Sequence, residues 1–208
     1  MNDMKHKTSL EEIETQTIHH YDLNAESFWQ GTRDHDVSQN IQAFLSALPV
    51  KKSLDILDLG CGPGRDLSTF KKLGHKPVGI DGSKRFCEMA QKFSQCEVWH
   101  QHFLNLELGD NIFDGIFANA SLFHIPSTQF PQVLSQCYRA LKSSGVLFMS
   151  NPRGNAEGWQ GNRYGHYMEL EESSDYLNAA GFSILDHYYR PPGLPKDQQP
   201  WLAIVAQR

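Results

Sequence analysis

The chain lacks the long apolar runs and the basic clusters that mark several large classes of protein. No stretch approaches the ~18 apolar residues that a membrane-spanning helix needs, so we expect a soluble protein. No lysine- or arginine-rich run occurs, and the formal net charge is −5, which argues against broad contact with nucleic acid. These absences favour a small-molecule substrate.

Cysteine is also scarce. The four cysteines, at positions 61, 87, 96 and 137, lack the close paired spacing of zinc sites, and the amino end does not resemble a secretion signal. We interpret them as reduced thiols in a cytoplasmic protein without a metal. The 208 residues suit one α/β domain. We expect a polar extension over residues 1–20 and a single domain over 21–208, with a lid over 21–50.

Glycine, in contrast, is concentrated in one short stretch. Residues 54–59 form a nearly continuous apolar run, typical of a parallel strand covered on both faces, with Asp58 near its carboxyl end. Glycines follow at positions 60, 62 and 64, and Asp66 begins the expected helix. Such a turn lets a ligand approach the backbone closely, because no side chain holds it away.

The spacing of these glycines distinguishes between two kinds of nucleotide site. The dinucleotide fingerprint is Gly-x-Gly-x-x-Gly, but here the pattern is Gly-x-Gly-x-Gly, with Arg65 at the place of the last fingerprint glycine. Carboxylates at positions 58 and 66 would also face a pyrophosphate. Twenty-one residues after Gly60, the expected strand 77–80 ends at Asp81, which can accept from two ribose hydroxyls. The pattern therefore predicts a nucleoside ligand without phosphates.

This combination resembles the class I S-adenosylmethionine (SAM) methyltransferases. The resemblance implies a Rossmann-like α/β fold: a seven-stranded, mostly parallel sheet with one antiparallel strand and helices on both faces. It implies SAM as cofactor and S-adenosylhomocysteine as product. The cofactor-binding candidates are Tyr21, Arg33, Asp58, Gly60, Cys61, Gly62, Gly64, Asp81, Gly82, Ser83, His102, Phe103 and Asn119. His102 stands where this class often has an acidic contact to the adenine amino group, so that contact is left open.

Apolar periodicity places the remaining elements. Strands are expected over 97–99, 113–118, 146–150, 182–189 and 201–206, and helices over 37–48, 66–73, 83–93, 128–141 and 169–180. Residues 157–167 show no periodicity and predict a long irregular loop, which is usually functional. Residues 190–195 contain three prolines and predict a rigid loop.

Three features have both a functional and a structural interpretation. The aromatic and charged stretch 21–36 is either a wall of the pocket or an aromatic cap on the sheet with solvated charges around it. Phe103 either stacks on a purine or belongs to the core. His124 either contacts the substrate or is a hydrogen-bonded histidine in a half-buried helix.

Two longer strings resemble a narrower family, the methyltransferase module of ovothiol biosynthesis, which methylates the π nitrogen of 5-thiohistidine. They are residues 28–40, Phe-Trp-Gln-Gly-Thr-Arg-Asp-His-Asp-Val-Ser-Gln-Asn, and residues 188–195, Tyr-Tyr-Arg-Pro-Pro-Gly-Leu-Pro. The resemblance covers roughly residues 20–208. The module is often fused to an iron-dependent sulfoxide synthase, and this chain has no such half. We therefore expect it to act alone on the methyl step, with a functional link to a separate synthase.

The resemblance also implies roles for individual residues. Arg33 becomes a candidate clamp for a carboxylate, and His124 or Asp34 a candidate catalytic acceptor for the imidazole N–H of the substrate. Substrate-binding candidates are Asn119, Asn151, Arg153, Tyr164, Tyr167 and Arg190. Alternatives remain: a SAM-dependent methyltransferase of another small molecule, or a non-catalytic SAM-binding module. Arg65 and the flanking carboxylates argue against a nicotinamide-dependent oxidoreductase.

Overall fold

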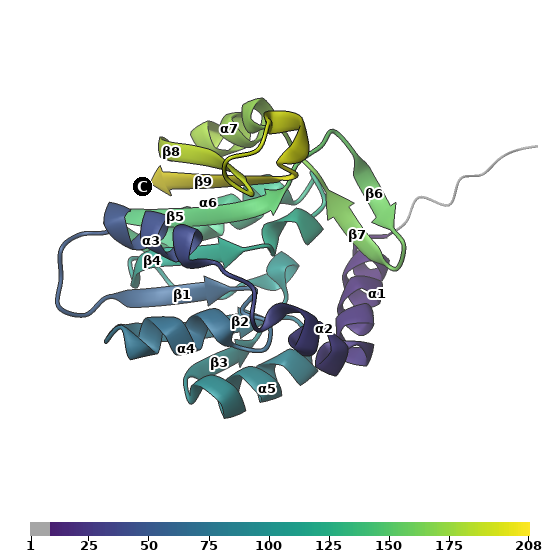
Figure 1. Ribbon diagram of the computed structural model, residues 1–208, viewed down its shortest axis with the longest axis horizontal. Coiled ribbons are helices and arrows are strands. Elements are labelled where there is room, and N and C mark those ends of the chain that lie inside the picture. The colour runs from purple at the N-terminus through teal and green to yellow at the C-terminus, as the bar shows by residue number, and fades with distance from the viewer. Residues whose placement is uncertain (1–8) are drawn as a thin grey trace, which may run out of the picture.

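A seven-stranded sheet forms the centre of the molecule (Figure 1). The computed structural model describes residues 9–208; residues 1–8, part of the predicted polar extension, lie outside the described residues. The strand order is β3-β2-β1-β4-β5-β9-β8. The bounds are β1 Asp55–Leu59, β2 Lys76–Asp81, β3 Glu97–His100, β4 Phe113–Asn119, β5 Leu141–Pro152, β8 Ser183–Arg190 and β9 Trp201–Gln207. Within this sheet β9 alone runs opposite to the other six strands, which confirms the predicted sheet.

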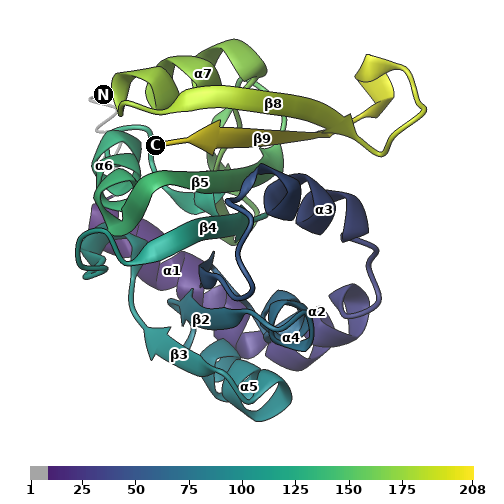
Figure 2. The same ribbon diagram turned by 90° about the vertical axis from the view of Figure 1, so that its left-hand side faces the viewer.

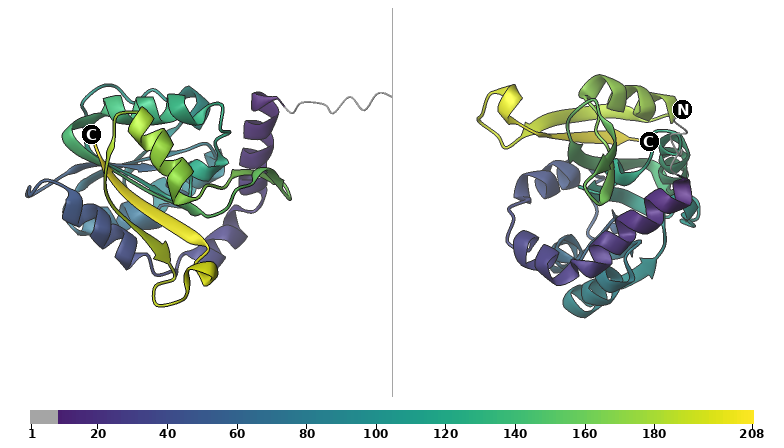
Figure 3. Two further views of the ribbon diagram at one scale, coloured as in Figure 1. Left: turned by 90° about the horizontal axis from the view of Figure 1, so that it is seen from above. Right: turned by 90° about the vertical axis from the view of Figure 1, so that its right-hand side faces the viewer.

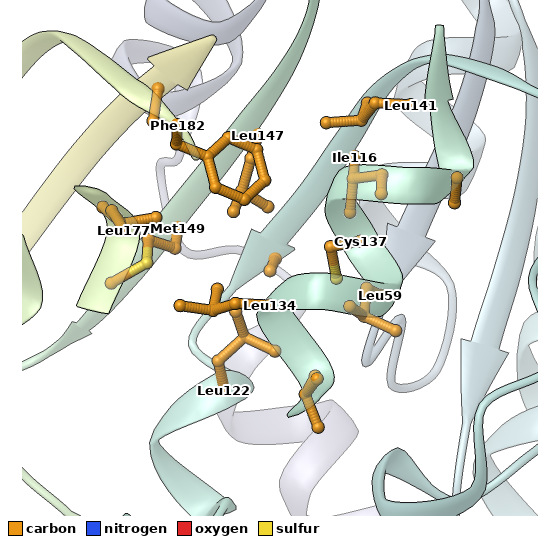
Figure 4. Close-up of a cluster of buried hydrophobic side chains, with 14 of the residues drawn as sticks. Leu59, Ile116, Leu122, Leu134, Cys137, Leu141, Leu147, Met149, Leu177 and Phe182 are labelled. Atoms are coloured by element: carbon orange, nitrogen blue, oxygen red, sulfur yellow. The ribbon is translucent and has the colours of Figure 1, made fainter. Parts of the chain in front are cut away.

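Helices cover both faces of this sheet (Figure 2). They are α3 Ser38–Ala47, α4 Arg65–Lys72, α5 Lys84–Ser94, α6 Phe130–Ala140 and α7 Leu170–Ala179. Successive residues of a strand point to opposite faces, so Phe117 of β4 packs with Phe44 of α3 while its neighbour Ile116 joins the cluster under α6 and α7. Figure 4 shows this second cluster, with Leu134 and Leu177 facing the strands.

The segment predicted as an irregular loop is a β-hairpin. Strand β6 (Glu157–Gln160) pairs with β7 (Arg163–His166), and the rings of Trp159 and Tyr164 meet edge to face across the pair, 5.7 Å apart. The two-residue turn Gly161–Asn162 has a glycine with φ of 64°. A two-residue Gly-Asn turn is a recognised hairpin signal, and the prediction of an irregular loop overlooked it.

The amino-terminal helices lie at one end of the sheet. Helix α1 (Leu10–Leu23) begins at Ser9, whose hydroxyl accepts from the backbone N–H of Glu12, and α2 (Ala25–Thr32) follows. The boundary expected at residue 20 therefore falls inside a helix. The right panel of Figure 3 shows α1 crossing the end of the sheet toward which β1, β4 and β5 point. Within residues 9–208 no helix is long and apolar enough to cross a membrane.

Candidate functional site

A cavity of about 640 Å³ lies at the carboxyl ends of β1, β2 and β4, beneath α1 and α2. This is the end of a parallel sheet where ligands bind, and the volume suits a small-molecule site. Of the residues predicted from the sequence, those that line it are Tyr21, Gly60, Cys61, Gly62, Asp81, Gly82, Phe103, Asn119, His124 and Arg190. The fold has thus brought most of the predicted cofactor contacts together.

The glycine turn serves packing at one position and leaves space at another. Gly60 has φ of 81°, and a Cβ there would lie 2.3 Å from the Cβ of Ser121, so only glycine fits. At Gly62 the nearest atom to an added Cβ is a ring carbon of Phe28, 3.8 Å away. The space above Gly62 is therefore cavity. Gly64 lies behind the turn and packs against Ala90, outside the cavity lining.

Asp81 is held rigidly beside this turn. One carboxylate oxygen accepts from the backbone N–H of Ser83 (2.8 Å) and the other from that of Gly62 (2.9 Å). Burial raises the pKa of Asp81 to about 6, while these backbone donors oppose the shift. Each oxygen keeps a free lone pair for a ribose hydroxyl. Ser83 itself is used structurally: its hydroxyl caps α5 and donates to Asp22 (2.6 Å).

A buried polar network lies under the turn. Asp66 accepts two hydrogen bonds from Arg65 (2.8 and 2.9 Å) and one from the side-chain amide of Asn119 (3.2 Å). The amide oxygen of Asn119 accepts from Asn40 (2.9 Å), so both ends of this side chain are used. Burial, and then the nearby Asp66, raise the pKa of Asp58 well above its ordinary value. Asn119 also lines the cavity, so its role in ligand binding stays a prediction.

His124 joins three separate elements. Its Nδ1 lies 2.6 Å from the carbonyl oxygen of Tyr164, which can only accept, so Nδ1 carries the proton. Its Nε2 therefore accepts from the hydroxyl of Tyr21 (2.7 Å), and that hydroxyl accepts from Arg163 (3.2 Å). Burial lowers the pKa of His124 to about 4, which keeps the ring neutral. Both ring nitrogens are occupied, so the predicted role as acceptor for a substrate N–H does not fit this geometry.

Two lid residues lie outside the cavity. Arg33 and Asp34 bind each other, Nε to Oδ2 at 3.1 Å, and their side chains are 53% and 84% exposed. They line an open groove beside α3 instead. The structure therefore does not place Arg33 as a clamp on the cofactor or Asp34 as a catalytic acceptor. Exposed side chains next to each other in the chain pair locally unless a ligand competes.

Four of the predicted substrate contacts also lie outside the cavity lining. Arg153 binds Glu169 and two carbonyl groups of the loop before β9, which ties that loop down. The Tyr164 hydroxyl donates to Glu157 (3.0 Å), and the Tyr167 ring packs against Phe123, with centroids 5.9 Å apart. Asn151 is buried, and neither atom of its amide has a partner among the described residues.

Other cavity residues were not predicted. Helix α1 contributes Glu14, Thr17 and Ile18, and β7 contributes Arg163. The sequence of α1 shows only a weak amphipathic pattern, because Ile13 and Thr17 are the only residues of this helix that are buried. At the opposite end, Arg190 donates from Nη2 to the carbonyl oxygen of Asp36 (2.9 Å). Its buried Nε–H has no partner in the described part of the chain.

The arrangement fits a cationic nucleoside ligand such as SAM. Asp81 offers acceptors for ribose, and Gly62 leaves space for close approach to the backbone. Within residues 9–208 no group of three or more metal-ligating side chains occurs.

Comparisons with known proteins agree with this geometry. Residues 56–145 match the family described as "Methyltransferase domain". An uncharacterised protein of Haemophilus influenzae is 31% identical over 60% of this chain and 58% of its own length. Malonyl-[acyl-carrier protein] O-methyltransferase of Buchnera aphidicola is 27% identical over 61% of this chain and 53% of its own. The chain therefore spans about half the length of these curated relatives.

A solved structure resembles nearly the whole chain. The 1,6-didemethyltoxoflavin-N1-methyltransferase of Burkholderia thailandensis, with bound 1,6-didemethyltoxoflavin and S-adenosylhomocysteine, superposes with a TM-score of 0.77 at 20% identity. The match covers 96% of this chain and 90% of that chain. Residues 56–145 thus resemble a methyltransferase domain, and the chain has the same Rossmann-like fold as this solved methyltransferase.

Proposed function

We propose that this protein transfers the methyl group of SAM to the π nitrogen of the imidazole ring of 5-thiohistidine. One observation supports this substrate above the others. The two strings that resemble the ovothiol module, residues 28–40 and 188–195, contact each other: Arg190 donates to the Asp36 carbonyl (2.9 Å), and the Tyr188 hydroxyl donates to Asn40 (2.9 Å). Residues from both strings line the same cavity.

That end of the cavity offers partners for the charged groups of an amino acid. The buried Nε–H of Arg190, which has no partner within residues 9–208, can donate to a carboxylate. Asp36 also lines the cavity, and hydrogen bonds from Ser38 lower the pKa of its carboxyl group, so it is ionised at neutral pH and can attract an ammonium group. A substrate with both groups would be held at two points, leaving its ring to face the glycine turn.

The protein's contribution to the reaction is mainly position. SAM would supply a sulfonium methyl group, and the acceptor nitrogen must lie about 3 Å from it, in line with the breaking bond. A neutral imidazole offers a lone pair at one nitrogen, and the proton on the other leaves once the ring is cationic, so no strong base is required. His124, neutral because burial lowers its pKa to about 4, adds no positive charge near the new cation.

The ring sulfur of the substrate is a competing nucleophile, so the cavity must keep it off the methyl axis. A site shaped for this sulfur would leave unpaired groups around plain histidine, a loss on the order of 1–3 kcal/mol for each group. The proposal implies a separate enzyme, such as an iron-dependent sulfoxide synthase, that supplies the thiolated amino acid. It also implies action in the cytoplasm, where SAM is available.

The test is a mass-spectrometric assay of the purified protein with SAM and either 5-thiohistidine or histidine. We expect N-methyl-5-thiohistidine as the product and at least tenfold slower turnover of histidine. Equal turnover of the two compounds would favour a methyltransferase of another small molecule. Binding of SAM without turnover of either would favour a non-catalytic SAM-binding module.

A further inference from the structure

Helix α1 places the carboxylate of Glu14 in the cavity. The sequence indicated no role for this residue. Glu14 lines the cavity, and its side chain is only 16% exposed. Its Oε2 lies 3.0 Å from Nδ1 of His102. Its Oε1 is buried and has no hydrogen-bond partner among the described residues. A buried carboxylate oxygen without a donor is costly, and a ligand that supplies a donor would remove this cost.

The surroundings of Glu14 suit a flat apolar ring. Ile18 follows it by one helical turn and lies over Gly82, where an added Cβ would meet the Cδ1 of Ile18 at 2.9 Å. Phe103 and Leu104 line the same cavity. The walls here are therefore apolar, and the Glu14 carboxylate is a polar acceptor beside them.

The order of the strands shows where Glu14 and His102 lie relative to Asp81, the expected acceptor for the ribose hydroxyls. The sheet runs β3-β2-β1, so the loop after β3, which holds His102, lies on the other side of Asp81 from the glycine turn that follows β1. A nucleoside with its ribose on Asp81 and its sulfur side toward the glycine turn would extend its base toward His102 and Glu14. The base would then reach the apolar walls.

We propose that Oε1 of Glu14 accepts a hydrogen bond from the exocyclic amino group of the adenine of SAM and of S-adenosylhomocysteine. This inference rests on the proposed function only in requiring that the cavity binds SAM. His102 is a positioning residue, because its Nδ1 holds the other carboxylate oxygen. Helix α1 thereby supplies the acidic adenine contact that the loop after β3 lacks.

A change of ligand tests the contact directly. S-inosylhomocysteine carries a carbonyl oxygen in place of the adenine amino group, so it would set an acceptor against the Glu14 carboxylate. By calorimetry we expect the unchanged protein to bind S-adenosylhomocysteine about 10- to 100-fold more tightly than the inosine analogue. Glu14→Gln, whose amide can face either base, should reduce this ratio to within about threefold.

Two controls separate the possible outcomes. Glu11→Gln changes an exposed carboxylate on the same helix and should preserve the full preference. If the unchanged protein binds no S-adenosylhomocysteine, the proposed function itself is wrong. If it binds but Glu14→Gln keeps the preference, or loses affinity for both ligands equally, the adenine contact is wrong and Glu14 is structural. Thermal unfolding of Glu14→Gln beside Glu14→Ala shows whether either variant has lost its fold.

Discussion

The floor and the cover of the cavity are built in different ways. We define the floor as the glycine turn 60–64 with Asp81, and the cover as α1, α2 and the β6–β7 hairpin. Asp81 is held by two backbone N–H groups, that of Gly62 in the turn and that of Ser83, two residues after Asp81 in the chain. The cover is held by hydrogen bonds between distant parts of the chain. The Tyr21 hydroxyl donates to His124, and the Thr17 hydroxyl accepts from the backbone N–H of Tyr164 (3.1 Å). The floor is thus preformed, whereas the cover depends on tertiary contacts.

The largest expected effect concerns the floor. Gly62→Val should abolish detectable binding of S-adenosylhomocysteine, because the branched side chain would fill the space that the turn leaves open. The left-handed backbone would cost about 1–2 kcal/mol of stability. Gly74→Val is the matched control, since Gly74 also has a positive φ and no atom within 4 Å of an added Cβ. Calorimetry that finds unchanged affinity in Gly62→Val would place the ligand elsewhere.

The next effect concerns the charge of the floor. Asp81→Asn should weaken binding of S-adenosylhomocysteine about 100-fold, since two hydrogen bonds to an ionised group are affected. In the unchanged protein, burial raises the pKa of Asp81 to about 6, so the carboxylate becomes protonated as the pH falls below 6. Protonation removes acceptor capacity, and affinity should fall by up to about tenfold per pH unit below that value. In Asp81→Asn this part of the pH dependence should vanish; its persistence would mean that another group titrates.

A smaller effect is expected at the other end of the cavity, where Arg190 at the end of β8 binds the carbonyl group of Asp36. Arg190→Lys should lower kcat/KM for 5-thiohistidine about 10-fold or more, because lysine cannot reproduce the planar guanidinium. The matched control is Arg33→Lys, which replaces an exposed guanidinium paired with the neighbouring Asp34. We expect that control to leave both kinetics and thermal stability nearly unchanged. A lower kcat/KM in Arg33→Lys, with unchanged kinetics in Arg190→Lys, would instead indicate that Arg33 binds the carboxylate, as the sequence suggested.

The smallest effect concerns the cover. Tyr21→Phe removes the donor to His124 Nε2 and the acceptor for Arg163, at a cost of about 1–3 kcal/mol. We expect faster hydrogen exchange in the β6–β7 hairpin, with the floor unaffected. Tyr164→Phe is the control, because the Tyr164 hydroxyl donates to Glu157 at the surface of the hairpin. Equal exchange in both variants would show that Tyr21 does not hold the cover in place.

The same division explains what the sequence could predict. The sheet, the glycine turn and Asp81 follow from short apolar runs and from spacing within about 25 residues. His124 and Asn119 line the cavity, but their hydrogen-bond partners Tyr21 and Asn40 are 103 and 79 residues away in the chain, so these hydrogen bonds could not be inferred from the sequence. Helix α1 gave little signal because it buries only two side chains. Arg33 and Asp34 were assigned from resemblance alone, which does not reveal which side of a loop faces the cavity.

Because α1 contributes to the wall of the cavity, undocking of this helix would weaken the binding of SAM there. If the ligand binds tightly only when this helix is docked, the measured Kd equals the intrinsic Kd divided by the docked fraction. About a tenfold smaller docked fraction would then raise the apparent Kd about tenfold, with every contact to the glycine turn unchanged. Substitutions at Ile13 and Thr17, the two buried residues of α1, would lower this fraction and would also change the cavity wall, because both residues line the cavity.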